Sequence, residues 1–324
     1  MAKLIMTVEE MQDRSKWLEM RKSGIGGSEA AAIVGLNPWK SAFQLWMEKT
    51  GQVEPEDLSD NEYVYWGNVL EQAVADRFCE LTGKKVQRRG MLQDDEYPYM
   101  LASVDRMVIG ENAGLECKTT NAFNSKVWAD DELPDSYYIQ CQWYMMVTGC
   151  EKWYIAVLIG GNKFIWKEVP RNAADIEALR KAAVDFWSMV ITNTMPPVDG
   201  SNDCSNALAD KFHGESGKTI DLPTAAKACI ERLRSIKESI GKLEEQKKLS
   251  ENELKSMLGD AEVGIIGEDK VTWKIQAGRV TVDSKRLKAE QPAIYESYSK
   301  IGNPIRVFKV CLLYTSPSPR DGAT

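Results

Sequence analysis

The clearest helical pattern in the chain lies in residues 61–83. Val64, Val74 and Phe78 recur there near helical spacing, which predicts an amphipathic helix with one apolar face. Glu71 stands beside this apolar stripe in the middle of the segment, apart from the charges that gather near its ends. This glutamate is therefore set apart from the other acidic residues of the predicted helix.

Short apolar segments after this helix predict a sheet. Each has the length of a strand and is bounded by turn-forming residues. The predicted strands are 84–95, 97–110, 113–121 and the two arms of a hairpin in 152–170 with the turn Gly160-Gly161-Asn162. Further helices are predicted at 136–149 and 172–193. This order predicts a mixed α/β (α+β) domain over residues 1–200, with a central sheet flanked by helices.

The rest of the chain has a different pattern. Residues 201–223 are polar and read as a linker. Residues 224–258 repeat apolar side chains three and four apart between mixed charges, which predicts a long coiled-coil-like helix within a helical and β-rich extension over 224–310. Residues 311–324 are rich in Ser, Pro and Gly and resemble translated vector sequence, so we expect a non-native, disordered tail.

Composition excludes several classes of protein. No run of about 18 apolar residues exists, so no membrane span is expected. The seven cysteines are scattered without a CxxC pair, which indicates reduced thiols in a cytoplasmic protein. The net charge of −7 counts against a broad DNA-coating surface, but it is compatible with a narrow basic cleft.

A single histidine, His213, narrows the chemistry further. It lies in a polar stretch, which excludes a Ser-His-Asp triad and His-rich zinc sites. Any hydrolytic reaction would therefore depend on carboxylates, lysine and a hard metal such as Mg²⁺.

Three charged residues at the ends of apolar strand segments are candidates for such chemistry. Asp105 ends one predicted strand, and Glu116 and Lys118 share a face of the next because they are two residues apart. Carboxylates there could bind Mg²⁺, and the lysine could orient a water or help to remove its proton. The ordinary alternative is a solvated hairpin with one cross-strand ion pair.

Four motifs in order resemble those of the YqaJ-like viral recombinases, the lambda-type phage exonucleases of the PD-(D/E)xK nuclease superfamily. They are the glycine-rich segment 21–41, the segment 66–71 that ends in Glu71, the pair "SVD" and "ECK" at 103–105 and 116–118, and "QCQWY" at 140–144. The resemblance covers roughly residues 14–195 and implies a restriction-endonuclease-like core. Val104 replaces the proline of the superfamily name, but that proline has no ligand role.

The resemblance implies a metal site. Asp105 and Glu116 would bind Mg²⁺, for which Mn²⁺ could substitute, and the Cys117 carbonyl would add a third oxygen. Glu71 would complete the metal shell from its helix. Lys118 would position or activate the attacking water.

The resemblance also assigns supporting residues. Gln140 would steady the active site through Lys118, although a buried amide bonded to backbone is an equal alternative. Arg21, Ser28 and Ser103 would form a pocket for the 5′-phosphate of a DNA end, because arginine grips phosphate with two donors and a serine near a helix start adds a hydroxyl. For Lys84, Lys85, Arg88 and Arg89, contact with the DNA backbone and a solvated edge strand are equally open interpretations.

The function implied is a Mg²⁺-dependent 5′→3′ exonuclease that degrades one strand of linear double-stranded DNA and leaves a 3′ single strand for phage-type recombination. The alternatives are a PD-(D/E)xK endonuclease or junction resolvase, and a catalytically inactive DNA-binding recombination module. The resemblance further implies a phage or prophage protein in a bacterial cytoplasm. Its partners would be a single-strand annealing protein and further copies of itself, commonly arranged as a ring.

Overall fold

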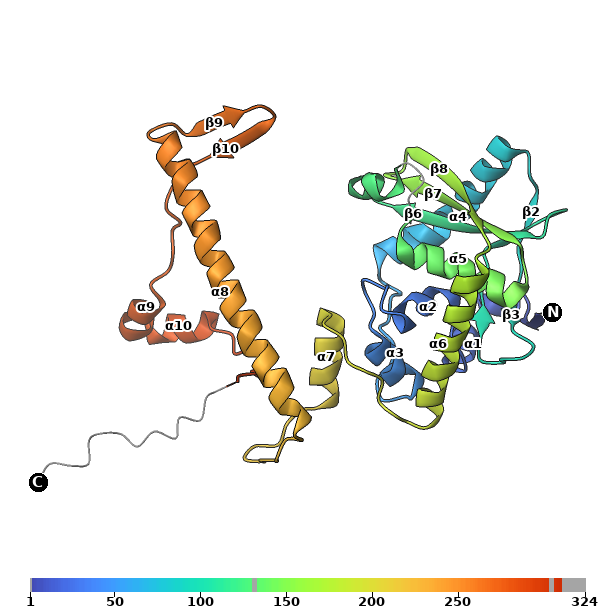
Figure 1. Cartoon of the computed structure of the whole chain (residues 1–324), viewed down its shortest axis with the longest axis horizontal. Helices are drawn as coiled ribbons and strands as arrows, with labels where there is room; N and C mark the ends of the chain where they lie inside the picture. The colour runs from blue at the N-terminus through green and yellow to red at the C-terminus, as the bar shows by residue number, and fades with distance from the viewer. Residues whose placement is uncertain (1, 130–132, 303–305, 311–324) are drawn as a thin grey trace, which may run out of the picture. The chain divides into compact units, whose positions relative to one another are not determined.

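The computed structural model describes residues 2–129, 133–302 and 306–310 of the chain. The chain divides into two compact units, Met1–His213 and Gly214–Thr324 (Figure 1). Within the described residues, no helix is long and apolar enough to cross a membrane. Residues 311–324, expected to be a disordered tail, lie outside the described part.

The centre of the first unit is a five-stranded mixed sheet. Its strands, in spatial order, are β2 (Val86–Gln87), β5 (Arg106–Val108), β6 (Ala113–Thr120), β7 (Lys152–Ile159) and β8 (Lys163–Pro170). β6 and β7 are parallel and the other neighbours are antiparallel. A parallel pair requires a crossover, which contains helix α5 (Asp135–Thr148). The predicted mixed α/β class and the hairpin of residues 152–170 are confirmed.

A second, three-stranded antiparallel sheet lies beside the first. It contains β1 (Lys3–Met6), β3 (Met91–Gln93) and β4 (Leu101–Ala102), in the order β1-β3-β4. The segment 97–110, predicted to be one strand, therefore divides between two sheets, because β4 pairs with β3 whereas β5 pairs with β6. The residues at the division are Ser103, Val104 and Asp105.

Helices surround the sheets. They are α1 (Arg14–Lys22), α2 (Gly27–Ile33), α3 (Ala42–Lys49), α4 (Glu62–Thr82), α5, α6 (Ala173–Ile191) and α7 (Asn202–Lys211), with short 3₁₀ segments at Glu10–Gln12 and Ala122–Trp128. The predicted helix of 61–83 begins where Asn61 accepts hydrogen bonds from two backbone N–H groups, and ends at Gly83 in the left-handed conformation (φ 71°).

The two faces of the large sheet are covered by different helices. Val74 and Phe78 of α4 pack against Leu115 and Tyr154 on one face. On the other face α5 packs with Ile155 and other alternate residues of β7 (Figure 1). Because side chains alternate along a strand, Leu115 and Cys117 face α4, whereas Glu116 and Lys118 face α5.

Residues 201–223 are not a simple linker. Their first part forms α7, whose Cys204 and Ala207 are buried. Asp203 accepts hydrogen bonds of 2.6 and 2.7 Å from the backbone N–H and the hydroxyl of Ser41, the residue that caps α3. The first unit thus extends to His213. Because most residues of α7 are polar, the composition did not indicate that Cys204 and Ala207 attach this helix to the first unit.

The second unit contains one long helix and smaller elements. They are α8 (Ala225–Leu258), β9 (Val263–Ile266), β10 (Asp269–Thr272), α9 (Ser284–Glu290) and α10 (Pro292–Tyr298). β9 and β10 form an antiparallel hairpin. The predicted helix over 224–258 and the small β-rich part after it are both present.

Candidate active site

Glu116 and Lys118 lie side by side on the face of β6 that α5 covers. The Lys118 Nζ is 2.6 Å from Glu116 Oε1. The glutamate is only 3% exposed. A charge that is so deeply buried is costly unless it is paired or binds a metal, so this is not the solvated hairpin surface that the sequence also allowed.

Asp105 joins this pair from the point where the chain passes between the two sheets. Its Oδ2 accepts a hydrogen bond of 2.7 Å from the backbone N–H of Cys117. The N–H and the C=O of one strand residue point to the same edge, so the Cys117 carbonyl also points to the side of Asp105. The structure thus brings together Asp105, Glu116 and the Cys117 carbonyl.

Gln140 approaches the same carboxylate from α5. Its Nε2 donates hydrogen bonds of 2.7 Å to Glu116 Oε1 and of 2.7 Å to the Tyr144 hydroxyl. Gln140 therefore contacts Glu116 and not Lys118. The lysine instead lies over the ring of Tyr137, with its Nζ 5.1 Å from the ring centroid. Tyr137, one turn before Cys141 on the same helix, carried no signal in the sequence.

The electrostatics of the site reflect crowded negative charge. Burial raises the pKa of Asp105 well above its usual value, and the charges of Glu116 and Glu71 add to this effect. Burial alone would lower the pKa of Lys118, but the carboxylates of Glu116 and Asp105 outweigh it and raise that pKa. Lys118 therefore stays cationic at neutral pH.

One oxygen of this site has no partner. Glu116 Oε2 is buried and accepts no hydrogen bond from any described residue. A buried carboxylate oxygen left unpaired is destabilising, and a hard cation would satisfy it. Together with Asp105 and the Cys117 carbonyl, it gives an all-oxygen donor set of the kind that Mg²⁺ prefers, so the residues present fit such an ion.

Glu71 is placed differently from the expectation that it completes the metal shell. Its carboxylate forms an ion pair with Arg106, which is 3% exposed and faces α4. Arg106 also donates to the Asp105 carbonyl (2.7 Å) and to Gln72 (3.0 Å). Among the described residues, no three His, Cys, Asp or Glu side chains are arranged to hold a metal ion. Glu71 is held by its ion pair with Arg106, an arginine that nothing in the sequence singled out.

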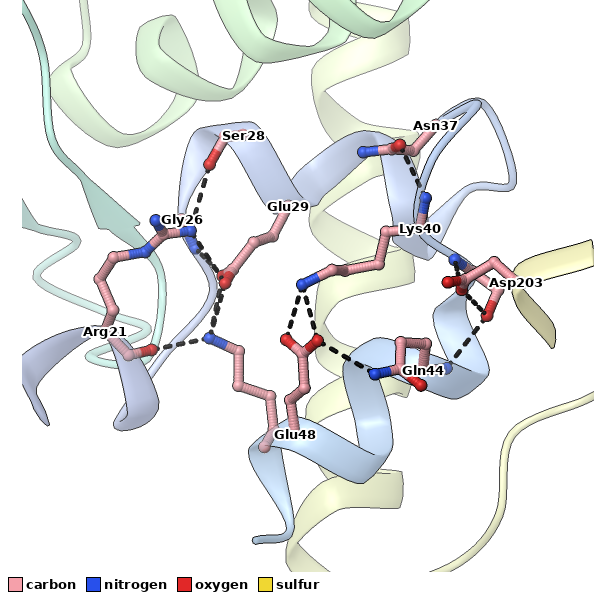
Figure 2. Close-up of polar contacts among 11 residues, drawn as sticks. Arg21, Gly26, Ser28, Glu29, Asn37, Lys40, Gln44, Glu48 and Asp203 are labelled. Atoms are coloured by element: carbon pink, nitrogen blue, oxygen red, sulfur yellow. Dashed lines mark hydrogen bonds and ion pairs between the residues drawn. The ribbon is translucent and has the colours of Figure 1, made fainter. Parts of the chain in front are cut away.

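Arg21 and Ser28 do come together, as expected for a phosphate pocket. Figure 2 shows Arg21 Nη2 directed at the Ser28 hydroxyl, 3.2 Å away, and at Glu29, whose Oε1 is 2.9 Å away. The guanidinium also lies over the Trp17 ring at 4.8 Å. Ser28 is the second residue of α2, and Gly26 occupies the N-cap position.

Glu29 is held strongly ionised beside this arginine. Burial would raise its pKa, but the charges of Arg21 and Lys49 lower it to about 2. Lys49 Nζ is 2.9 Å from Glu29 Oε2 and also donates to the Arg21 carbonyl. Glu29 thus fixes both cations at the start of α2.

A close approach joins this segment to the carboxylate pair. A Cβ on Gly27 would lie 2.5 Å from the ring of Tyr144, whose hydroxyl accepts from Gln140. Only glycine allows α2 to pack so near α5. Tyr144 therefore connects the glycine-rich segment through Gln140 to Glu116.

The remaining predicted residues are scattered. Ser103 is half-buried at the division between β4 and β5, beside Asp105 in sequence. In the basic stretch, Lys84 forms an ion pair with Glu111, whereas Lys85, Arg88 and Arg89 are exposed at the edge strand β2 and the turn after it.

Several known proteins are similar to this chain in sequence or in structure. The YqaJ-like viral recombinase domain model matches residues 16–151. Uncharacterized protein YqaJ of Bacillus subtilis (strain 168) is 44% identical over 302 residues, which cover 91% of this chain and 94% of that protein. The alkaline exonuclease LHK-Exo of Laribacter hongkongensis has a TM-score of 0.50 at 17% identity, over 56% of this chain and 94% of that one. Its complex with dAMP gives 0.50 at 19% identity with the same coverage.

The structural likeness shows a shared fold, in agreement with the predicted nuclease-type core. The sequence likeness extends over nearly all of both chains and includes the motifs that carry the site. The chain therefore belongs to the YqaJ-like viral recombinase family.

Proposed function

We propose that this protein is a Mg²⁺-dependent 5′→3′ exonuclease that degrades one strand of linear double-stranded DNA. The observation that carries the proposal is the buried, unpartnered Oε2 of Glu116, next to Asp105 and Lys118. The fold that the chain shares with LHK-Exo, which is described as an alkaline exonuclease and was solved with dAMP, adds support.

Asp105, Glu116 and the Cys117 carbonyl would hold Mg²⁺. When bound, the ion would neutralise the scissile phosphate and lower the pKa of the attacking water. Gln140 keeps Glu116 oriented through its 2.7 Å hydrogen bond, which leaves Oε2 available as a ligand. Gln140 is thus a positioning residue.

Lys118 would act as a cation in this reaction. Its raised pKa keeps the ammonium protonated, so it can donate hydrogen bonds to the attacking water or to a phosphate oxygen but is a poor proton acceptor. The cation also stabilises the negative charge that grows on the phosphate in the transition state.

Arg21 and Ser28 would bind the 5′-phosphate of the DNA end. The contacts of Arg21 to Ser28 and Glu29 both use Nη2, and within the described residues no hydrogen bond uses its Nε or Nη1. Those donors could therefore grip a phosphate while Glu29 holds the side chain in place. Ser103 would contribute its hydroxyl from the division between the sheets. The exposed Lys85, Arg88 and Arg89 would contact backbone phosphates farther from the end.

The product would be a duplex with a 3′ single strand, which is a substrate for strand annealing. We propose a single-strand annealing protein as a partner and a phage or prophage origin in a bacterial cytoplasm. A ring of copies around the DNA would keep the protein on its substrate between successive cleavages. The partnership is tested by copurification of the full chain with a single-strand annealing protein encoded beside it. The proposal predicts a stable complex, and its absence would contradict the partnership.

The reaction is tested on a linear duplex that carries a 5′-phosphate at one end only, with Mg²⁺, with Mn²⁺ and with EDTA. The proposal predicts mononucleotides released from the phosphorylated strand, with Mn²⁺ able to replace Mg²⁺, and no release in EDTA. A closed circle is the control substrate. Nicking of the circle would indicate an endonuclease or resolvase, and binding without any cleavage would indicate an inactive recombination module.

The phosphate pocket is tested by Arg21→Ala, with Lys22→Ala as the matched control. Lys22 is the adjacent cation, but its ammonium is paired with Glu54, 2.7 Å away. Arg21→Ala should reduce the preference for phosphorylated over hydroxyl ends by about tenfold, the effect of about 1.4 kcal/mol of lost binding. An equal loss of preference in both variants would contradict the assignment.

A further inference from the structure

Helix α8 carries a seven-residue repeat of apolar side chains that is exposed along its length. The positions a and d of the repeat are Ala226, Cys229, Leu233, Ile236, Ile240, Leu243, Lys247, Ser250, Leu254 and Met257. Lys247 and Ser250 are polar, and Ala226 and Leu233 are half-buried. Ile240 is 49% exposed, Leu243 63% and Met257 81%. Such a repeat over nearly five heptads is typical of a helix that pairs with another helix.

The helix is long enough to form a stable pair. It runs for 34 residues without interruption, which corresponds to about 51 Å at ~1.5 Å per residue, and ends at Gly259. It forms the long axis of the second unit in Figure 1. None of its residues is buried within the described chain. Its apolar face therefore requires an occupant of similar length.

We infer that α8 pairs in antiparallel orientation with α8 of a second copy of this chain, over the full length of both helices. The two-fold axis would lie at the middle of α8, between Gly241 and Lys242. In this register each a position packs against a d position of the second copy. Ile240 then packs against Leu243 of the second copy, and the same layer occurs again across the axis.

The outer layers are also compatible with this register. Ala226 meets Met257 of the second copy, and Cys229 meets Leu254. The two polar positions, Lys247 and Ser250, face Ile236 and Leu233 of the second copy, respectively. Lys247 can cover Ile236 with its methylene groups, because its ammonium lies 3.7 Å from Glu251 of its own helix.

The charges beside the repeat select the antiparallel orientation. In this register Arg232 faces Glu253 of the second copy, and Lys237 faces Glu244. Each contact occurs twice by symmetry, so four ion pairs flank the apolar layers. Within the part of the chain that the structure describes, none of these four residues forms an ion pair. Charges at these flanking positions set partner and orientation in coiled coils.

Other arrangements are disfavoured by the same charges. A parallel pair would bring Arg232 close to Lys237 of the second copy. Sliding the antiparallel pair by one heptad separates Arg232 from Glu253 in either direction, and it brings Glu244 against Glu244 or Lys237 against Lys237 of the second copy. Charge complementarity therefore singles out a second copy in the full-length antiparallel register, and not an acidic or basic partner helix.

The pairing is tested by measuring the mass of the full chain in solution by light scattering. Ile240→Lys/Leu243→Lys places four like charges at the centre of the pair and should halve the mass. Ser235→Lys, which adds a lysine on the outer face of α8, is the control and should leave the mass unchanged. Circular dichroism would verify that α8 remains helical. A wild type that is monomeric at tens of micromolar, or a mass that the double variant does not change, would overturn the proposal.

Orientation is tested with the native Cys229 under mild oxidation. An antiparallel pair keeps the two Cys229 side chains apart, so wild type should form no Cys229–Cys229 disulfide. Leu254→Cys should produce a crosslinked dimer, and peptide mapping should find the bond between Cys229 and position 254. A Cys229–Cys229 bond in wild type would overturn the antiparallel orientation.

The register is tested by charge reversal. Arg232→Glu should raise the dimer dissociation constant by about tenfold, because two attractive pairs become repulsive. Adding Glu253→Arg should restore the wild-type value. Absence of both the loss and the rescue would overturn the proposed register. None of these residues belongs to the candidate active site, so a failed pairing would leave the proposed reaction untouched.

Discussion

Gln140 of α5 and Glu116 of β6 meet at the covered face of the sheet, where the Gln140 amide donates a 2.7 Å hydrogen bond to Glu116 Oε1. The bond occupies one carboxylate oxygen and leaves the other, Oε2, buried without a partner. Glu116 is therefore oriented before any cation arrives. The amide thus reaches Glu116, and not Lys118, through which it was expected to steady the site.

Gln140→Leu should lower metal affinity and the rate of cleavage by about 10- to 100-fold, the usual effect of losing a residue that orients a metal ligand. Gln142→Leu is a matched control. Gln142 is also buried on α5, but it bonds to Pro170 and Asn172 on the side away from the site. The control should lose stability and keep its metal affinity, as followed by titration calorimetry. Equal metal affinity in both variants would contradict the positioning role.

Glu71→Gln should act on stability more than on metal binding. Its partner Arg106 is buried, and weakening that ion pair leaves a buried cation less compensated. We expect the free energy of unfolding to fall by about 1–3 kcal/mol, measured by denaturant titration. Mn²⁺ affinity should change by less than about threefold. A tenfold loss of affinity without loss of stability would place Glu71 in the metal shell after all.

Gly27→Ala should disturb the site from a distance. The added methyl group would lie 2.5 Å from the buried ring of Tyr144, so the ring must move. This movement would displace the Tyr144 hydroxyl and disturb its hydrogen bond with Gln140. Overpacking of this kind costs about 1–3 kcal/mol. Gly35→Ala is a control for the loss of glycine, since a Cβ there meets nothing within 4 Å, although its φ of 73° adds strain. Only Gly27→Ala should slow cleavage at temperatures where both variants are folded.

The Glu29 carboxylate should make stability depend on pH in the acid range. Its pKa is about 2 in the folded chain, against about 4.3 in an unfolded one. Its contribution is therefore fully present above about pH 4.5, and it is lost as the pH falls toward 2. The difference corresponds to roughly 3 kcal/mol.

Glu29→Gln checks this pH dependence. The variant should be less stable than wild type at pH 7, and the two should converge between pH 4.5 and 2 in chemical denaturation. The variant also leaves Lys49, whose pKa burial already lowers, without its main counter-charge. A constant difference in stability across this pH range would contradict the assignment.

The fold could be predicted from the sequence where periodicity was strong. The helix around Val74, the hairpin of 152–170 and the long helix of 224–258 all appear as expected. The division of 97–110 between two sheets could not be predicted, because it depends on which strands Leu101 and Arg106 find as partners. Long-range pairing of this kind leaves no local pattern.

The candidate site shows the same limit. Asp105, Glu116 and Lys118 could be grouped because strand alternation places them on one face or at one strand end. The pairing of Glu71 with Arg106 could not, since Arg106 sits next to Asp105 in sequence but faces the opposite helix. The contact of Lys118 with Tyr137 depends in turn on where α5 crosses the sheet.

The most direct test of the proposed reaction is a titration of Mn²⁺ into wild type, Asp105→Asn and Lys118→Met. The free ion is measured by its electron paramagnetic resonance spectrum. Wild type and Lys118→Met should bind the ion with similar affinity, and Asp105→Asn should bind it at least tenfold more weakly. Both variants should fail to cleave a linear duplex. Undiminished Mn²⁺ binding by Asp105→Asn, or cleavage by Lys118→Met at the wild-type rate, would contradict a metal-dependent nuclease site at these residues.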